Sequence, residues 1–503
     1  MRHPLRALEF GLLATLACAV ASCDAGAEDR EARVVNALVR AEELNLRSRP
    51  ALVAGKYARR ASDFYSFFRG EVPVYVRDLL DATDGLGASK YAVTSPRVPT
   101  IGDAHPENFG TLHSASGTGN FEAAASLEAN DFDAAERLPY LVDLRRLCIG
   151  LAVATRVANS DDAVAHDAAM AKLDTIVGAA ARAYGESMIA RARGIAPPAL
   201  DTSGAVIADV FRRSDRDAPK HVELTDLTLL NGSTRTIKRG ALDAASPEQG
   251  YLDAPAVVHA HIDELFATYQ RVLPLTLSNG FFRVKDIVRE VGSGVASWSK
   301  IRFIVLTEGP TNAPEDDVMF EVKELADSSW PAFFPPLTSA STNAERVRTF
   351  AHRAFSSANV EPLWQAVPWL GMDWQVRREA SSNKTVRTAR LVAEQGKPEA
   401  IAGLARALGL MLAAIHAGGS AAQETGAIHA IAAAIGTDLD GFVAEQVRIG
   451  ITGGSRVEAD WHLFQHAVST RGLTLGFTPA QGDAPPVDVR ALIGTPLAPA
   501  HYP

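Results

Sequence analysis

Two polar segments in the first third of the chain carry side chains whose types and spacing suit chemistry on phosphate groups. The first runs from Gly102 to Gly110 and places Asp103 five positions before Asn108; the second contains Asp131 and Asp133. Carboxylate and amide oxygens are the ligands that Mg²⁺ prefers, and a carboxylate beside a hydroxyl group can orient and deprotonate it. Clustered carboxylates repel one another unless a cation lies between them. The pattern therefore predicts a metal-assisted site.

Each of these side chains can be given a role at such a site. Asp103 is predicted to be catalytic, as the group that orients and deprotonates an acceptor hydroxyl. Asn108, Asp131 and Asp133 are predicted to hold the metal ion, for which we expect Mg²⁺. A predicted β-hairpin over residues 109–131 separates the two segments and would return the second to the first.

The spacing Asp-x-x-x-x-Asn resembles the catalytic loop of protein kinases. The fuller pattern, from Gly102 to Asn108, is more similar to the aminoglycoside and choline kinase branch of the kinase-like superfamily. Residues 130–133 resemble the metal loop of that branch, and Asp143 resembles the structural aspartate of its following helix. By the same resemblance His105 takes the place of a lysine that contacts phosphate, and it is predicted to be catalytic.

The segments that resemble a nucleotide-binding lobe follow the catalytic segment, whereas in kinases they precede it. A glycine turn of Gly292, Ser293 and Gly294 resembles the turn whose backbone N–H groups cover nucleotide phosphates. Lys323, near the end of a predicted strand, resembles the lysine that pairs with the α and β phosphates. Glu345, on a later predicted helix, is the candidate ion-pair partner of that lysine.

The resemblance implies an α+β, kinase-like two-lobe fold in circularly permuted order, with a mainly helical larger lobe and a small antiparallel sheet lobe. It implies ATP or another nucleotide as the cofactor beside Mg²⁺. The expected divisions are a signal peptide at 1–23, a tether at 24–45, a catalytic-loop part of the helical lobe at 46–200, an insertion or connecting segment at 201–275, a small β lobe at 276–335, a helical part that completes the lobes at 336–480 and a tail at 481–503.

Apolar periodicity predicts the elements that must position these residues. Helical spacing predicts a helix over residues 140–157, with Arg145 and Arg146 on its polar side. Further helices are predicted at 163–193 and 404–416, and three successive strands at 281–291, 300–306 and 318–324.

The beginning of the chain is typical of an exported protein. Arg2 and Arg6 precede a short apolar stretch, and small residues lead to Cys23. This arrangement resembles the bacterial lipoprotein box, which implies that Cys23 is lipidated and holds the protein on a membrane. The expected location is the cell envelope, on the periplasmic or another extracytoplasmic face.

The bulk composition narrows the classes of protein. Hydrophobic residues make up 47% of the 503 residues and charged residues 22%, which is a globular balance. A net charge of −9 argues against a nucleic-acid partner. Besides Cys18 and Cys23, Cys148 is the remaining thiol, so an internal disulfide is not expected in the mature chain. Its apolar neighbours predict an inert core position.

The pattern as a whole also resembles a bacterial family, domain of unknown function 2252. The blocks that carry this resemblance span most of residues 60–470 and are residues 67–70, 102–110, 130–147, 291–297 and 320–329. The resemblance favours a fold more than it identifies a substrate.

The predicted function is transfer of a phosphoryl group from a Mg-nucleotide to a hydroxyl group on a small molecule or a protein. Two alternatives stay open. ATP is essentially absent outside the cytoplasmic membrane, so an exported protein of this kind could be a non-catalytic, pseudokinase-like binding lipoprotein. A metallophosphoesterase would use dispersed histidines together with the aspartates, and the candidates are His113, His166, His259, His261 and His416.

Overall fold

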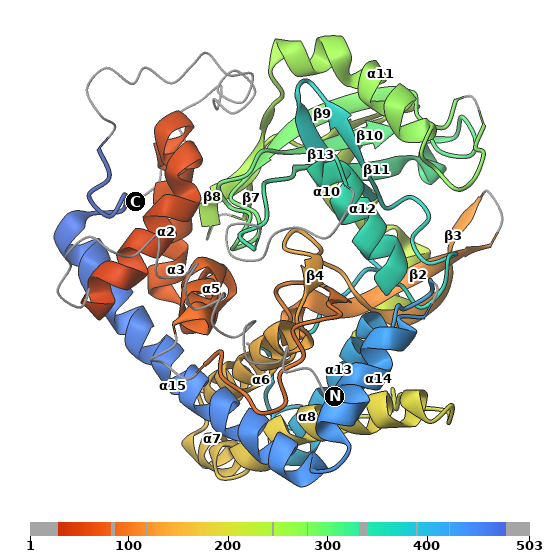
Figure 1. Ribbon diagram of the computed structural model, residues 1–503. Coiled ribbons are helices and arrows are strands. Elements are labelled where there is room, and N and C mark those ends of the chain that lie inside the picture. The colour runs from red at the N-terminus through yellow and green to blue at the C-terminus, as the bar shows by residue number, and fades with distance from the viewer. Residues whose placement is uncertain are drawn as a thin grey trace, which may run out of the picture.

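The computed structural model describes residues 29–81, 86–116, 119–243, 246–278, 280–330, 340–388, 391–421 and 423–478. The predicted signal peptide with Cys23, and the predicted tail, lie outside the described residues. Figure 1 shows a sheet with its covering helices at the upper right, a larger helical part below it, and the first helices of the chain at the left. The protein is a mixed α+β structure with antiparallel sheets, as predicted.

Four helices open the described chain: α2 (Arg30–Ser48), α3 (Pro50–Ser62), α4 (Phe64–Gly70) and α5 (Val72–Leu80). The predicted tether at 24–45 is wrong from Arg30 onward, because α2 is a packed helix that buries Val34 and Leu38. The apolar residues of these helices form a core with the long C-terminal helix α15 (Leu439–Arg471). Figure 1 shows α2, α3 and α5 beside α15.

The two polar segments lie in loops that short strands hold together. β1 (Val98–Thr100) pairs with β4 (Glu136–Leu138), so the chain enters the first segment and leaves the second at one place. Between them come the 3₁₀ turn η1 (Pro106–Asn108) and the predicted hairpin, which is confirmed as β2 (Phe109–Ser116) and β3 (Asn120–Ala129). The topology therefore forces the segments around Asp103 and Asp131 to be neighbours.

The helical part is centred on α6 (Tyr140–Val157), which has the predicted bounds, and on α8 (Leu173–Ala192) and α13 (Pro398–His416). The predicted helix at 163–193 is two helices, since α7 (Ala163–Met170) ends before α8 begins. α14 (Thr425–Ile435) completes the group. Cys148 is fully buried, and burial raises the pKa of its thiol to about 12, which agrees with an inert core position.

The prediction that Arg145 and Arg146 lie on a polar side of α6 is wrong. Both side chains are essentially fully buried. Apolar periodicity could not reveal this, because each guanidinium is neutralised by a carboxylate from a distant segment. Arg145 pairs with Glu445 on α15, and Arg146 pairs with Asp103 and Glu71.

The main sheet has seven antiparallel strands in the order β12-β13-β11-β10-β9-β8-β7. The three predicted successive strands are confirmed as β9 (Val284–Val291), β10 (Arg302–Thr307) and β11 (Val318–Glu324). The others are β7 (Gly240–Asp243), β8 (Ser246–Asp253), β12 (Gln365–Trp369) and β13 (Met372–Arg378). The segment at 201–275 is therefore not a separate insertion, because it supplies two strands of this sheet. Its other elements are α9 (Ala205–Asp217), η2 (Ala218–Lys220), α10 (Val222–Leu227), β5 (Thr228–Asn231), β6 (Thr234–Ile237) and α11 (Ala256–Gln270).

Alternate residues of the central strands point to opposite sides of the sheet. Because hydrophobic residues occupy both sets of positions, both faces are apolar. Phe303 and Val305 pack in the core that includes α11, while Ile304 and Leu306 pack in a smaller core on the other face. α12 (Asn343–Ala354) touches β12 and β13, and its apolar residues belong to the core of the helical part. This helix therefore links the sheet to the helical part.

The apolar character of α13 comes from its position in this core. By length and hydropathy α13 could cross a membrane, but 61% of its apolar window is buried inside the protein. It packs closely on α8, where a Cβ atom at Gly409 would overlap the backbone of Ala180.

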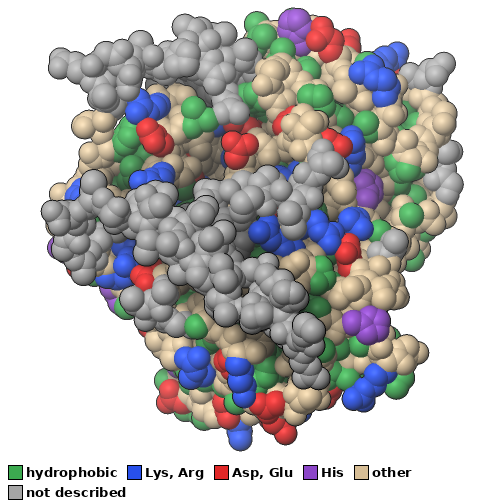
Figure 2. All heavy atoms as spheres, viewed as in Figure 1, with side chains coloured by type: hydrophobic (Ala, Val, Ile, Leu, Met, Phe, Trp, Pro, Cys, Tyr) green, Lys and Arg blue, Asp and Glu red, His purple; other side chains and the backbone are tan. Residues whose placement is uncertain are grey.

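On the described atoms of the face in Figure 2, acidic and basic side chains are interspersed, with no broad area of one sign.

Candidate functional site

The two polar segments share the wall of one cavity of about 160 Å³, between the helical part, the sheet and the N-terminal helices. Asp103, Asn108, Asp131 and Asp133 all line it, as the sequence predicted. The remaining charged lining residues are Glu42, Lys56, Arg60, Arg69, Lys300 and Asp327. The cavity thus places carboxylates and an amide opposite several basic groups.

Arg146 from α6 fixes the carboxylate of Asp103. Its Nε lies 2.8 Å from Asp103 Oδ1, and its other nitrogens donate to Glu71 and to the Phe68 carbonyl. The guanidinium also lies over the ring of Phe68, 3.9 Å from the centroid. Because the Arg146 side chain is fully buried and held on several sides, Asp103 is presented to the cavity in one orientation.

A second buried carboxylate holds the backbone that carries Asp103. Asp143 accepts hydrogen bonds from the backbone N–H of Ile101 (2.8 Å) and of Gly102 (2.9 Å). His416, the last residue of α13, lies 3.4 Å from the same carboxylate. Gly102 has φ of 78°, and a Cβ atom there would overlap the Ala134 carbonyl, so this position requires glycine.

Asn108 joins the two polar segments. Its Nδ2 donates to the Asp103 carbonyl (2.9 Å), and its backbone carbonyl accepts from Asn130 N (3.0 Å). Because Nδ2 donates to this carbonyl, the amide oxygen is the atom of the side chain that can coordinate a metal ion in the cavity. The neighbouring Glu107 fixes η1 from outside by bonding to Arg69 and Thr388.

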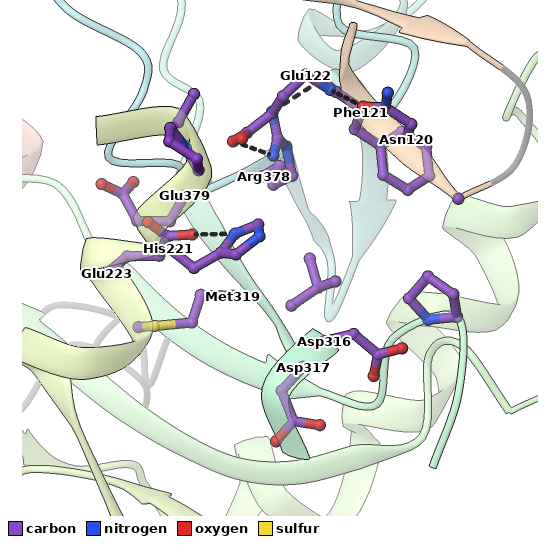
Figure 3. Close-up of a pocket in the computed structure, with 15 residues that line it drawn as sticks. Asn120, Phe121, Glu122, His221, Glu223, Asp316, Asp317, Met319, Arg378 and Glu379 are labelled. Atoms are coloured by element: carbon purple, nitrogen blue, oxygen red, sulfur yellow. Dashed lines mark hydrogen bonds and ion pairs between the residues drawn. The ribbon is translucent and has the colours of Figure 1, made fainter. Parts of the chain in front are cut away.

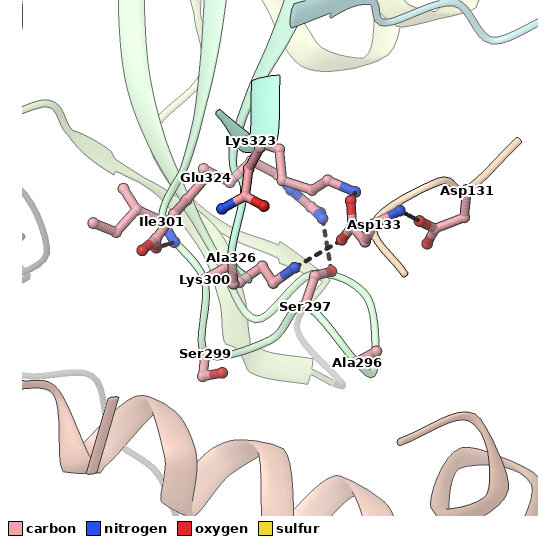
Figure 4. A network of polar contacts seen from close by, with 12 residues as sticks. Asp131, Asp133, Ala296, Ser297, Ser299, Lys300, Ile301, Lys323, Glu324 and Ala326 are labelled. Atoms are coloured by element: carbon pink, nitrogen blue, oxygen red, sulfur yellow. Dashed lines mark hydrogen bonds and ion pairs between the residues drawn. The ribbon is translucent and has the colours of Figure 1, made fainter. Parts of the chain in front are cut away.

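Two lysines neutralise Asp133 and leave Asp131 without an ion-pair partner among the described residues. Lys300 Nζ lies 2.8 Å from Asp133 Oδ2, and Lys323 Nζ lies 3.1 Å from Asp133 Oδ1. Figure 4 shows both lysines pointing toward this carboxylate. Although burial opposes ionisation, Lys300 and Lys323 lower the pKa of Asp133. Burial and the charge of Asp133 raise the pKa of Asp131, which receives a hydrogen bond from Asp133 N (3.1 Å).

Packing and α12 hold the segment that carries these aspartates. Phe132 is fully buried and packs edge-on against Phe355 and Trp364. Arg346 on α12 donates to the carbonyls of Ala135 (2.6 Å) and Asp133 (3.1 Å). The predicted ion pair of Glu345 with Lys323 is wrong, because Glu345 accepts from Ser341 at the exposed start of α12.

His105 lies behind Asp103, away from the cavity wall. It is 1% exposed, and its Nε2 lies 3.7 Å from Asp103 Oδ2. Burial, with Arg69 and Arg146 nearby, lowers the pKa of His105 well below its ordinary value, so the ring is neutral. In this position it lies against Asp103 and does not line the cavity.

The predicted glycine turn follows β9 but does not line the cavity. Gly292 and Gly294 have φ of 72° and 77°, which glycine adopts without strain. Arg302 binds the side chain of Ser293 between them. Later residues of the same connection, including Ala296 and Lys300, form the cavity wall.

Several basic residues of the site were not predicted from the sequence. Lys56 and Arg60 come from α3, for which no chemistry was predicted. Lys300 is the first residue of a predicted strand, and no role at the site was predicted for it. One signal was present for Arg146, because a charged residue within an apolar helical run has to find a partner if it is buried. Its partners, Asp103 and Glu71, could not be identified from spacing.

The predicted metal ligands are compatible with a divalent ion, but they are few. Among the described residues there is no group of three or more His, Cys, Asp or Glu side chains placed to share a metal ion. The donor set is two carboxylates and an amide, which is suitable for Mg²⁺ when phosphate oxygens and water complete the coordination. A cation beside Asp131 would favour its ionised form, which its surroundings disfavour.

A larger cavity of about 420 Å³ lies elsewhere, between the tip of β3 and β11. Figure 3 shows Arg378 beside Glu122, and His221 beside Glu223. None of the predicted site residues lines it. Its charges are largely satisfied within the protein.

Comparison with known proteins identifies a family. The family described as "Uncharacterized protein conserved in bacteria (DUF2252)" matches residues 47–467. No curated protein and no solved structure matches the chain. The matched range contains both polar segments, the whole sheet and the cavity lining apart from Ala41, Glu42 and Asn45. The chain belongs to the DUF2252 family of bacterial proteins.

Proposed function

We propose that this protein is a kinase-like phosphotransferase that uses a Mg-nucleotide to modify a hydroxyl acceptor. One observation carries the proposal: Asp103, Asn108, Asp131 and Asp133 line a single cavity, and Lys323 reaches Asp133 from the sheet. Phosphoryl transfer needs a group near the attacking hydroxyl, oxygen ligands for the metal and a cation for the phosphates. These groups are present in one place.

We further propose that the fold is kinase-like in circularly permuted order. In support, the glycine turn, the Lys323 strand, a helix and two more strands follow one another from β9 to β13. α13 then leads to His416, which contacts Asp143 beneath the catalytic segment, although that segment comes far earlier in the chain. Cutting such a fold between the catalytic segment and the sheet, and joining its ends, would give this order.

Each residue of the site has a separate role in the proposed transfer. Asp103, oriented by Arg146, accepts the proton of the acceptor hydroxyl. Asp131 and Asn108 would hold Mg²⁺, which when bound neutralises phosphate charge. Lys323 and Lys300, which now pair with Asp133, would bind phosphate oxygens in its place when a nucleotide is bound. A volume of about 160 Å³ is below the roughly 300 Å³ of common ligand sites, so the cavity suits the phosphates and the ion, with the nucleoside outside it.

A non-catalytic binding lipoprotein is the second candidate, and the closed ion pairs favour it. Lys300 and Lys323 neutralise Asp133, so this carboxylate does not require a metal ion. A metallophosphoesterase has less support, because no described histidine lines the cavity.

The proposal predicts that Asp131→Asn removes Mg²⁺-dependent nucleotide binding. A non-hydrolysable ATP analogue at about 100 times its Kd should stabilise the wild type by about 2.7 kcal/mol when Mg²⁺ is present. We expect little of this stabilisation in the variant, because the main anionic ligand is lost. Thermal unfolding with and without Mg²⁺ measures it. Because protonated Asp131 cannot hold Mg²⁺, nucleotide binding should weaken as the pH falls. The raised pKa of Asp131 predicts that this weakening begins at a higher pH than it would for an ordinary aspartate.

Asp161→Asn is the matched control, because Asp161 is exposed and makes the same change of charge away from the site. Equal stabilisation of wild type and Asp131→Asn would contradict the metal role, and so would stabilisation that does not depend on Mg²⁺.

We also propose that the protein is anchored to a membrane of the cell envelope through lipidated Cys23. The prediction is that labelled palmitate enters the wild type and not Cys23→Ser, and that the variant leaves the membrane fraction. Accumulation of an unprocessed precursor in the presence of globomycin would be a second expected result. Unlabelled protein in the soluble fraction would show that the leader is an ordinary cleaved signal or is not used.

A further inference from the structure

The guanidinium of Arg60 on α3 is buried at the cavity without a partner of opposite charge. Arg60 is 3% exposed, it lines the cavity, and its Nε makes no hydrogen bond. Within the described chain its side chain takes part in no hydrogen bond or ion pair. Burial lowers the pKa of Arg60, but a guanidinium in a protein stays protonated. An unpaired buried cation is costly, so its retention calls for a ligand.

The carboxylates whose charges act on Arg60 are those of Glu42 and Glu71, and both are committed to other cations. Glu42 binds Lys56 and accepts from Ser299 (2.8 Å), and Glu71 binds Arg146. Lys56 lies beside them on the same cavity wall and is itself buried, which lowers its pKa to about 8. This side of the cavity therefore has more positive charge than its own carboxylates neutralise.

The surrounding structure fixes the position of Arg60. A Cβ atom at Gly70, the last residue of α4, would overlap the guanidinium. The guanidinium therefore occupies space that is open only because residue 70 has no side chain. The guanidinium also lies over the ring of Tyr57, 5.9 Å from its centroid. These contacts hold the charge in place before any ligand arrives.

We propose that Arg60, with Lys56 beside it, binds a phosphate group on the α3 side of the cavity. Asp131 lacks an ion-pair partner among the described residues, so the cavity has a free cation and a free carboxylate in its walls. A phosphate accompanied by a divalent cation complements both. The inference rests on the proposed function only for the identity of the phosphate carrier, which is either the nucleotide donor or a phosphorylated acceptor.

The test measures the binding of inorganic phosphate in the presence of EDTA, by calorimetry or by thermal unfolding. We expect Arg60→Gln to weaken phosphate binding by roughly 10-fold or more, because a charge-assisted hydrogen bond is lost. Arg59→Gln, which changes an exposed neighbour on the same helix, should bind as the wild type does. Asp131→Asn should bind phosphate at least as well. Equal phosphate affinity in wild type and Arg60→Gln, or no binding by either, would overturn the proposal.

The ligand-free variant separates a binding role from a structural one. Removing an unpaired buried charge should leave the unfolding temperature of Arg60→Gln unchanged or raised. A large fall would mean that Arg60 supports the fold, and it would overturn the proposal.

Titration with a Mg²⁺-bound ATP analogue then identifies the carrier. Weaker analogue binding by Arg60→Gln assigns the phosphate to the donor, and unchanged binding assigns it to the acceptor. If Arg60 governs phosphate binding but Asp131→Asn leaves nucleotide binding intact, the anion site stands and the phosphotransferase proposal fails.

Discussion

Asp103→Asn should lower the rate of phosphoryl transfer by about 100- to 10,000-fold while nucleotide binding is retained. The side chain keeps its shape, and its amide oxygen can still accept from Arg146, which now donates to a carboxylate oxygen at 2.8 Å. What is lost is the ability to take a proton from the acceptor. The effect should therefore fall on kcat and leave the affinity for the Mg-nucleotide close to that of the wild type.

The measurement is transfer of label from γ-labelled ATP to a panel of hydroxyl acceptors, which includes sugars, amino alcohols and protein hydroxyls. Asp161→Asn again serves as the control for a loss of charge at an exposed site. An unaffected rate in Asp103→Asn would remove this residue from the chemistry. A wild type that binds the nucleotide but labels none of the acceptors would favour the non-catalytic alternative.

The sequence predicted the local features of the site because those features are local in the chain. The interval from Asp103 to Asn108 is set by one loop and one 3₁₀ turn, and the return to Asp131 is set by one hairpin. Such short-range relations follow from turn and strand patterns. The strands of the sheet were found for the same reason, since alternation and continuous apolar runs mark them.

The features that sequence analysis missed depend on contacts between distant segments. The neutralisation of Asp133 by Lys300 joins residues 167 positions apart. Arg146 and Glu71 are buried together, although each by itself reads as a surface residue. The role of α2 and α3 in closing the cavity was hidden because amphipathic helices at the start of a chain give no sign of the surface they cover. Tertiary pairing of charges, which periodicity does not encode, decided each of these cases.

Asp143→Ala should lower the free energy of unfolding by about 3–5 kcal/mol, the largest effect on stability that we expect from the site. The carboxylate is fully buried and accepts from two backbone N–H groups, those of Ile101 and Gly102. Alanine leaves both donors without an acceptor in a dry environment, and each unsatisfied group costs about 1–3 kcal/mol. Loss of the contact with His416 adds to this cost. Denaturant unfolding followed by circular dichroism measures the change.

Asp143→Asn and Asp440→Ala make the test specific. Asparagine keeps an acceptor oxygen, so its effect should lie between those of alanine and the wild type. Asp440 pairs with Arg182 on the surface, with 88% of its side chain exposed, and its loss should cost less than about 0.5 kcal/mol. If Asp143→Ala were no more harmful than Asp440→Ala, the backbone of Ile101 and Gly102 would be held by something else. In that case Asp143 would also not be the support of the loop that presents Asp103.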